Sequence, residues 1–167
     1  NAFTNSKNSI GAIYIVRDPR NVITSIQNHF QLSSEEAFKF LSDKKNALST
    51  IQENKESLYF QPLGSWNDHV NSWVKNKNFP VLKIRYEDLT KSTYETFKII
   101  VKFIKKITKS NNQFNRNKAI NSIKNTSFEK LKDMEDKKGF NESRENKKTG
   151  KKIKFFYLSN KNNYKNI

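Results

Sequence analysis

The sequence predicts an α/β protein in which a short parallel sheet is flanked by helices. A short run rich in β-branched residues occurs at 13–16, and two sets of residues alternate over 81–86. Segments with apolar residues at helical spacing lie between and after these two runs. This alternation of strands and helices favours a parallel sheet. Because two strands do not make a stable sheet by themselves, we expect the chain to be part of a larger domain.

The first half of the chain predicts one strand followed by helices. A polar loop over residues 1–12 precedes the strand at 13–16, and Pro19 stands where a helix that continues to Gln31 can begin. The spacing of Ser33 and Glu36 predicts a capping box at the start of the next helix. Four later apolar residues are expected to form a core stripe: Phe38, Leu41, Leu48 and Ile51.

The second half begins after a break at Pro62 and Gly64 with an amphipathic helix near residues 66–73. A second strand follows, in which Leu82, Ile84 and Tyr86 alternate with polar residues. A capping box at Ser92 and Glu95 opens the next helix. Its apolar stripe is Phe97, Ile100, Val101 and Ile104.

The C-terminal third predicts two short helices, near 117–124 and 127–137, the second closed by Gly139. Residues 141–154 are charged and contain glycine, so we expect a mobile loop there. The apolar run "FFYL" at 155–158 is expected to anchor the end of the chain.

Composition narrows the class of partner. The 167 residues include 32 Lys and Arg against 16 Asp and Glu, a formal net charge of +16. Only five of the basic residues are arginine, and the lysines are scattered among asparagines, which argues against nucleic acid as the main partner. A basic surface still attracts small anionic ligands.

The absence of cysteine rules out disulfides and thiolate metal sites, and no metal is expected. No apolar run approaches the roughly 18 residues of a membrane span, and no signal peptide is visible. We therefore predict a cytoplasmic location without membrane attachment.

The stretch "IYIVRDPRNVITS" (13–25) places Arg17 directly after the first strand. A strand that ends at a turn leading into a helix N-terminus is a ready site for an anion. The planar fork of an arginine suits phosphate oxygens. The alternative interpretation of Arg17 is a surface arginine that caps the strand.

Four stretches together resemble the sulfotransferase family. They are "VRDPRNVITS" (16–25), "GSWNDHVNSW" (64–73), "VLKIRYEDL" (81–89) and "NTSFEKLKDMEDKKGF" (125–140). The family transfers a sulfuryl group from 3′-phosphoadenosine 5′-phosphosulfate (PAPS) to a hydroxyl or amine of a small acceptor. The resemblance implies a partial P-loop-like three-layer fold, PAPS as co-substrate and a single, incomplete domain over residues 1–167. The resemblance does not indicate whether the chain forms oligomers.

The resemblance also implies which residues bind PAPS. Arg17 and Ser25 match the pair that holds its 3′-phosphate, and Tyr86 matches a tyrosine at the adenine. Thr126, Ser127 and Phe128 match a segment that closes on the adenine, where an aromatic face can stack on a base. Ser127 also stands where it can cap the following helix.

The helix at 64–73 matches a family helix that we interpret as packing and acceptor-side scaffold, with Trp66, His69 and Trp73 as its large side chains. His69 is not expected to be the general base. His29 has no matched role.

Two departures from the family pattern weaken the predicted site. Tyr157, Leu158 and Ser159 stand where the family has Arg, Lys and Gly, so two positive charges at the 3′-phosphate are missing. The family's glycine-containing phosphosulfate loop and catalytic base precede the first strand, and residues 1–10 offer neither. We therefore expect an inactive fragment that carries the 3′-phosphoadenosine half of the site.

Two other functions stay open at this point. A different P-loop-like enzyme, such as a nucleotide kinase, would prefer a 5′-triphosphate to a 3′,5′-bisphosphate. A non-catalytic basic interaction module would bind polyanions with a steep salt dependence.

Overall fold

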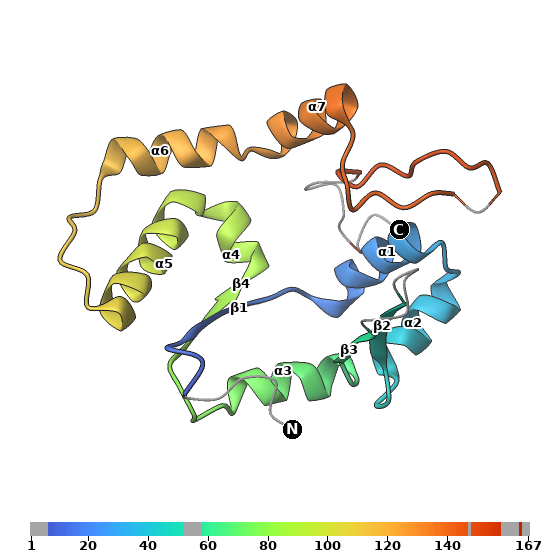
Figure 1. The fold of residues 1–167 in the computed structure, drawn as a ribbon, viewed down its shortest axis with the longest axis horizontal. Helices are drawn as coiled ribbons and strands as arrows, with labels where there is room; N and C mark the ends of the chain where they lie inside the picture. The colour runs from blue at the N-terminus through green and yellow to red at the C-terminus, as the bar shows by residue number, and fades with distance from the viewer. Residues whose placement is uncertain (1–6, 52–57, 147, 158–163, 165–167) are drawn as a thin grey trace. The chain divides into compact units, whose positions relative to one another are not determined.

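A computed structural model describes residues 7–51, 58–146, 148–157 and 164 (Figure 1). Helices and strands follow one another in this order: β1 (Ala12–Val16), α1 (Pro19–Phe30), α2 (Ser34–Ser42), β2 (Ala47–Ile51), β3 (Leu58–Pro62), α3 (Trp66–Val74), β4 (Val81–Arg85), α4 (Tyr86–Lys91), α5 (Thr93–Thr108), α6 (Arg116–Asn125) and α7 (Phe128–Lys138). The chain divides into two compact units, one of Asn1–Arg17 with Asn76–Ile167 and the other of Asp18–Lys75. The predicted α/β class is confirmed.

The first unit contains the predicted parallel sheet. β1 pairs with β4 in a register that runs from Ala12 opposite Val81 to Val16 opposite Arg85. The residue before β1, Gly11, lies close against α5 and against Pro80, which directly precedes β4. A Cβ at Gly11 would lie 2.9 Å from Ile107 Cδ1 and 3.1 Å from the Pro80 carbonyl oxygen. Only glycine fits there without a shift of its neighbours.

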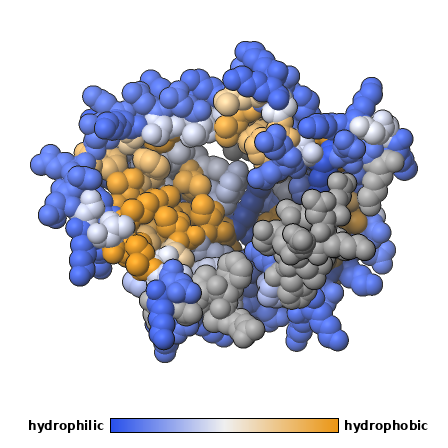
Figure 2. Space-filling model, in the orientation of Figure 1, coloured by the Kyte–Doolittle hydropathy of each residue, from blue (hydrophilic) through white to orange (hydrophobic). Residues whose placement is uncertain are grey.

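Burial in this sheet is uneven. Ile84 of β4 is 6% exposed, whereas Ile13 and Ile15 of β1 are 38% and 46% exposed. Figure 2 shows the corresponding apolar surface, which extends over α5 in the orientation of Figure 1. Ile84 of β4 is therefore buried, whereas Ile13 and Ile15 of β1 remain partly exposed to solvent.

The stretch predicted as the second strand, "VLKIRYEDL" (81–89), extends beyond the strand that forms. β4 ends at Arg85, and Tyr86 is the first residue of the short helix α4. Apolar alternation runs through Tyr86 in the sequence, but the backbone turns into a helix at that residue. Tyr86 thus follows the last paired residue of β4.

The predicted capping box at Ser92 and Glu95 is wrong. The Ser92 side chain makes no cap hydrogen bond at the start of α5. The reason is that α4 leads directly into α5. The Ser92 amide still donates to the Asp88 carbonyl at 2.9 Å, and the buried Thr96 hydroxyl donates to the same oxygen at 3.2 Å.

In the second unit, α2 begins at the predicted capping box. The Ser33 amide donates to Glu36 Oε2 at 2.8 Å, and the Glu36 amide donates to Ser33 Oγ at 3.2 Å. The helix predicted near residues 66–73 is also confirmed as α3, whose N-cap Ser65 accepts from the Asp68 amide at 3.1 Å.

The predicted core stripe after Ser33 is not formed as expected. Phe38 is 63% exposed, and α2 ends at Ser42. The turn after it is held by Asn46, which donates from Nδ2 to the Phe40 carbonyl at 2.9 Å. Beyond this turn the chain is extended. Leu48 and Ile51 belong to β2, which pairs antiparallel with β3.

The two predicted short helices are α6 and α7, and α7 ends at Gly139 with a positive φ of 73°. After α7 the chain doubles back on itself. An antiparallel bridge joins Glu145 and Lys152, and the Ile153 amide donates to the Arg144 carbonyl at 2.7 Å. The mobility expected for 141–154 stays a prediction.

Candidate functional site

Arg17 and Tyr86 form the centre of the candidate site. They directly follow Val16 and Arg85, the last paired residues of the two parallel strands, so they lie at the carboxyl edge of the sheet. The Arg17 guanidinium carbon lies over the Tyr86 ring, 4.4 Å from the ring centroid. Such a cation–π contact contributes about 0.5–2 kcal/mol and holds both side chains in place. Ligands of open α/β sheets bind at this edge.

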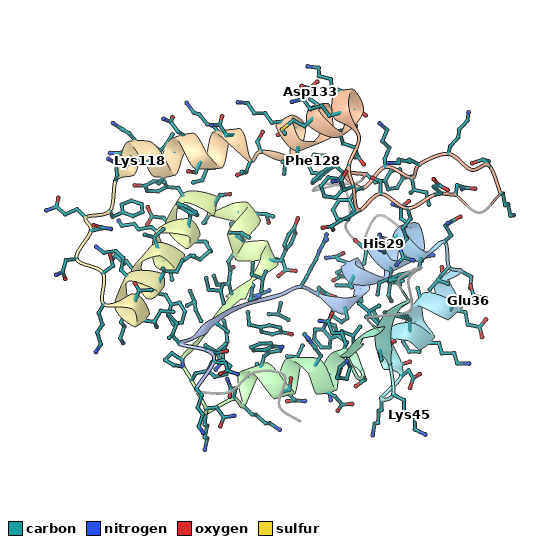
Figure 3. All side chains as sticks on the ribbon, in the orientation of Figure 1. His29, Glu36, Lys45, Lys118, Phe128 and Asp133 are labelled. Carbon is teal, nitrogen blue, oxygen red and sulfur yellow. The ribbon has the colours of Figure 1, made fainter. Side chains whose placement is uncertain are left out.

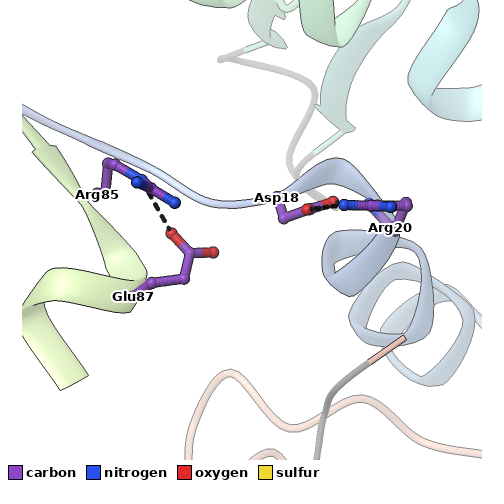
Figure 4. Close-up of polar contacts among 4 residues, drawn as sticks. All are labelled: Asp18, Arg20, Arg85 and Glu87. Carbon is purple, nitrogen blue, oxygen red and sulfur yellow. Dashed lines mark hydrogen bonds and ion pairs between the residues drawn. The ribbon is translucent and has the colours of Figure 1, made fainter. Parts of the chain in front are cut away.

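The guanidinium of Arg17 is partly withdrawn from solvent. Its Nε is buried and has no hydrogen-bond partner among the described residues, while the residue makes other interactions with the protein. Arg85, one residue before Tyr86, is exposed and lies 3.8 Å from Glu87, measured from Nε to Oε2 (Figure 4). Of these two arginines at the sheet edge, Arg17 is the better placed to receive an anion, because it is half-buried against an aromatic ring.

The N-terminus of α1 is occupied by a carboxylate of the chain itself. Asp18 Oδ1 accepts from the Arg20 amide and from Arg20 Nε, each at 2.9 Å, and Asp18 Oδ2 accepts from Arg20 Nη2 at 2.6 Å (Figure 4). A negative side chain here complements the helix dipole. The helix N-terminus predicted as an anion site is therefore capped internally, and an arriving phosphate would depend on side chains.

Ser25 lies on the exposed surface of α1. It belongs to the unit of Asp18–Lys75, whereas Arg17 belongs to the other unit. Their joint contact with one phosphate stays a prediction.

The segment of Thr126, Ser127 and Phe128 joins α6 to α7. The Thr126 hydroxyl donates to the Ser122 carbonyl at 2.9 Å, and Ser127 Oγ accepts from the Lys130 amide at 3.4 Å. The predicted helix cap at Ser127 is thus confirmed. Phe128, labelled in Figure 3, is the first residue of α7 and half-buried.

The Phe128 ring is oriented by a neighbour from the end of the chain. It meets the Phe156 ring edge-on, with centroids 6.0 Å apart and an angle of 78° between the planes. An edge-to-face pair of this kind is a favourable arrangement that fixes the orientation of the two rings relative to each other. This contact links the segment predicted to close on adenine with the C-terminal apolar run.

Of the residues that replace the family's Arg-Lys-Gly, the structure describes Tyr157, which is 58% exposed. Leu158 and Ser159 lie outside the described residues. A tyrosine side chain has no cationic form, so the expected loss of a cation at this position follows from the residue type itself.

Sequence reasoning missed Glu135 of α7. This residue is 5% exposed and accepts three hydrogen bonds, two of them from the amides of Phe155 and Phe156. One signal could have found it. Glu135 lies seven residues after Phe128 and four after Leu131, so an acidic residue occupies the apolar face of an amphipathic helix.

Two of the large side chains of α3, His69 and Trp73, contact each other. The rings of His69 and Trp73 meet edge-on, 6.5 Å apart. Burial lowers the pKa of His69 and so favours the neutral form of its imidazole. Within the described ranges, no three His, Asp or Glu side chains gather closely enough to hold a metal ion.

The sulfotransferase domain family matches residues 2–166 of this chain. The chain therefore belongs to the sulfotransferase family, as the four sequence stretches indicated. A curated relative, sulfotransferase 2A6 of Rattus norvegicus, is 32% identical over 95 residues, which are 56% of this chain and 31% of that protein. The match thus spans about a third of the relative's length. In the described part of the chain, no helix combines the length and apolarity needed to cross a bilayer.

Proposed function

We propose that this chain supplies the 3′-phosphoadenosine-binding part of a PAPS-dependent sulfotransferase. The observation that supports this most directly is the contact of Arg17 with Tyr86 at the carboxyl edge of the β1–β4 sheet. A fixed, half-buried guanidinium beside an aromatic ring suits a ligand that carries both a phosphate and a purine.

Each side chain then has a defined task. Arg17 donates to the 3′-phosphate, Ser25 donates a second hydrogen bond to it, and Tyr86 contacts the adenine. The segment at 126–128 closes on the base, where Phe128 offers its ring face. PAPS, when bound, supplies the sulfuryl group that is transferred to a hydroxyl or amine of a small acceptor.

The same proposal treats residues 1–167 as one incomplete sulfotransferase domain. The family's phosphosulfate loop and catalytic base have no counterpart in the residues before β1. We therefore expect no sulfuryl transfer by this chain alone. Its cytoplasmic location likewise stays a prediction.

Thermal melting with adenosine 3′,5′-bisphosphate tests the proposal. A ligand that binds only the folded state raises the midpoint, and at a hundredfold excess over Kd the stabilisation is about 2.7 kcal/mol. That corresponds to a shift of several degrees. We expect a shift with the bisphosphate, no comparable shift with ATP, and no shift in Arg17→Ala.

Arg85→Ala is the matched control. It removes the same charge one residue before Tyr86, from an exposed side chain that is paired with Glu87. The control should respond to the bisphosphate as the unaltered chain does. A larger shift with ATP would instead favour a nucleotide kinase. Salt-sensitive polyanion binding that ignores Arg17→Ala would favour a basic interaction module.

A further inference from the structure

Glu135 is a buried acidic group that the proposed binding of PAPS does not use. Ser143 Oγ donates to its Oε1 at 2.9 Å, the Phe155 amide donates to the same oxygen at 2.7 Å, and the Phe156 amide donates to Oε2 at 2.9 Å. Both carboxylate oxygens therefore accept hydrogen bonds from the protein, and the residue is almost completely removed from solvent.

The chemistry of the site favours the ionised carboxylate. Burial raises the pKa of Glu135, but the two amides, the Ser143 hydroxyl and the charge of Lys154 lower it by more. An ionised carboxylate accepts hydrogen bonds and donates none, which matches three donors aimed at it. Removing such an acceptor leaves buried donors unsatisfied.

The three donors come from both ends of the segment that follows α7 and doubles back through the bridge between Glu145 and Lys152. Ser143 lies near its beginning, and Phe155 and Phe156 lie at its end. One side chain of α7 therefore closes this segment and fixes the backbone of Phe156. The Phe156 ring in turn packs against Phe140, 5.4 Å away, and against Phe128, 6.0 Å away.

We propose that Glu135 is a positioning residue for Phe128. It holds the Phe156 amide, and the Phe156 ring then sets the orientation in which Phe128 presents its face to adenine. This inference rests on the proposed function for its ligand, but the coupling of Glu135 to the two rings belongs to the protein alone.

The substitution Glu135→Gln interrupts this coupling selectively. Its amide oxygen can still accept from Ser143 and Phe155 in place of Oε1, but its amino group then faces the Phe156 N–H, donor against donor. Asp136→Asn is the matched control. Asp136 is the next residue and pairs with Lys154 of the same segment, but it is exposed to solvent.

Two ligands separate positioning from general damage. Affinities are measured for adenosine 3′,5′-bisphosphate and for 1-deoxyribose 3,5-bisphosphate, which lacks the base, in the full chain. We expect Glu135→Gln to weaken the adenine ligand about tenfold, the scale of one base–aromatic stack. It should leave the base-free ligand unchanged, and Asp136→Asn should affect neither. Equal losses for both ligands, or no loss, would overturn the inference.

A second measurement does not need a ligand. In the chain with labelled phenylalanines, the nuclear Overhauser contact between the Phe128 and Phe156 rings should disappear in Glu135→Gln and persist in Asp136→Asn. Persistence in Glu135→Gln would overturn the inference. If Glu135→Gln does not fold, Phe156→Leu must reproduce the selective loss for the adenine ligand, and an unchanged affinity would refute the role of Phe156.

The two hypotheses can fail separately. Absence of binding of either bisphosphate to the unaltered chain would refute the proposed function. The ring contact would then decide, by itself, whether Glu135 positions Phe128.

Discussion

At the scale of single residues, the surroundings of a side chain decide its charge state and its conformation. Arg17 is held by the ring of Tyr86, the first residue of α4, and Glu135 is held by two amides from the end of the chain. In both cases the partner is distant in sequence.

Glu135 predicts an acid-dependent stability. Its pKa in the folded chain lies below the 4.5 of a free glutamate, so its contribution is present above about pH 4.5 and is lost as the pH falls through the lower folded value. Urea unfolding as a function of pH should show this loss below pH 4.5. Glu135→Gln should reduce the slope of the free energy of unfolding against pH in this range. Glu129→Gln, on the exposed surface of the same helix, is the control for removing one glutamate. Equal slopes in the unaltered chain and Glu135→Gln would contradict the assignment.

At the scale of elements, helix starts depend on what precedes them. Ser33, Ser65 and Ser127 follow non-helical residues, and each accepts from a backbone amide of the helix it precedes. Ser92 follows the last turn of α4, where its own amide remains bonded to Asp88. The same sequence signature therefore gives a cap in one context and none in the other.

The serine caps predict a contrast in stability. Ser33→Ala removes an acceptor for the Glu36 amide and should cost about 1 kcal/mol. Ser92→Ala removes no cap bond and should cost less than about 0.5 kcal/mol. Chemical denaturation measures both free energies of unfolding. A cost for Ser92→Ala equal to that of Ser33→Ala would show that Ser92 caps α5 in solution.

At the scale of the whole molecule, the chain has two compact units and few buried side chains. Among the described residues, the buried apolar ones are Ile26, Ala37, Ile84 and Ala119, and no large side chain is fully buried. Ile84 belongs to the first unit and Ala37 to the second. Each unit therefore has its own core, with few buried apolar side chains among the described residues.

This organisation predicts local responses to core substitutions. Ile84→Ala should cost about 2–5 kcal/mol and accelerate hydrogen exchange in β1, β4 and α5, but not in α2. Ala37→Gly, in the middle of α2, should cost about 1 kcal/mol and show the reverse pattern. Acceleration of both units by both variants would instead support the single domain expected over residues 1–167.

The strongest sequence patterns predicted the corresponding local structures. The β-branched run at 13–16 predicted β1, the alternation of apolar and polar residues predicted β4, and the apolar spacing predicted α1, α3 and α5. Arg17 was placed at a strand end because the apolar run stops there and Pro19 follows. These features depend on side-chain periodicity and on local hydrogen bonds, which neighbouring residues specify.

The sequence by itself determined the family, the α/β class and the residues expected to meet the 3′-phosphoadenosine. Only the tertiary structure decided that Tyr86 begins a helix and supports Arg17, that Asp18 caps α1, and that residues 47–51 pair as a strand. It also decided that Glu135 holds the Phe155 and Phe156 amides. The physical reason is the same in each case. These features depend on contacts that lie outside the local pattern of apolar and polar residues. Secondary-structure propensity and hydrophobic periodicity are local properties, so they do not specify which distant donor or ring a side chain will contact.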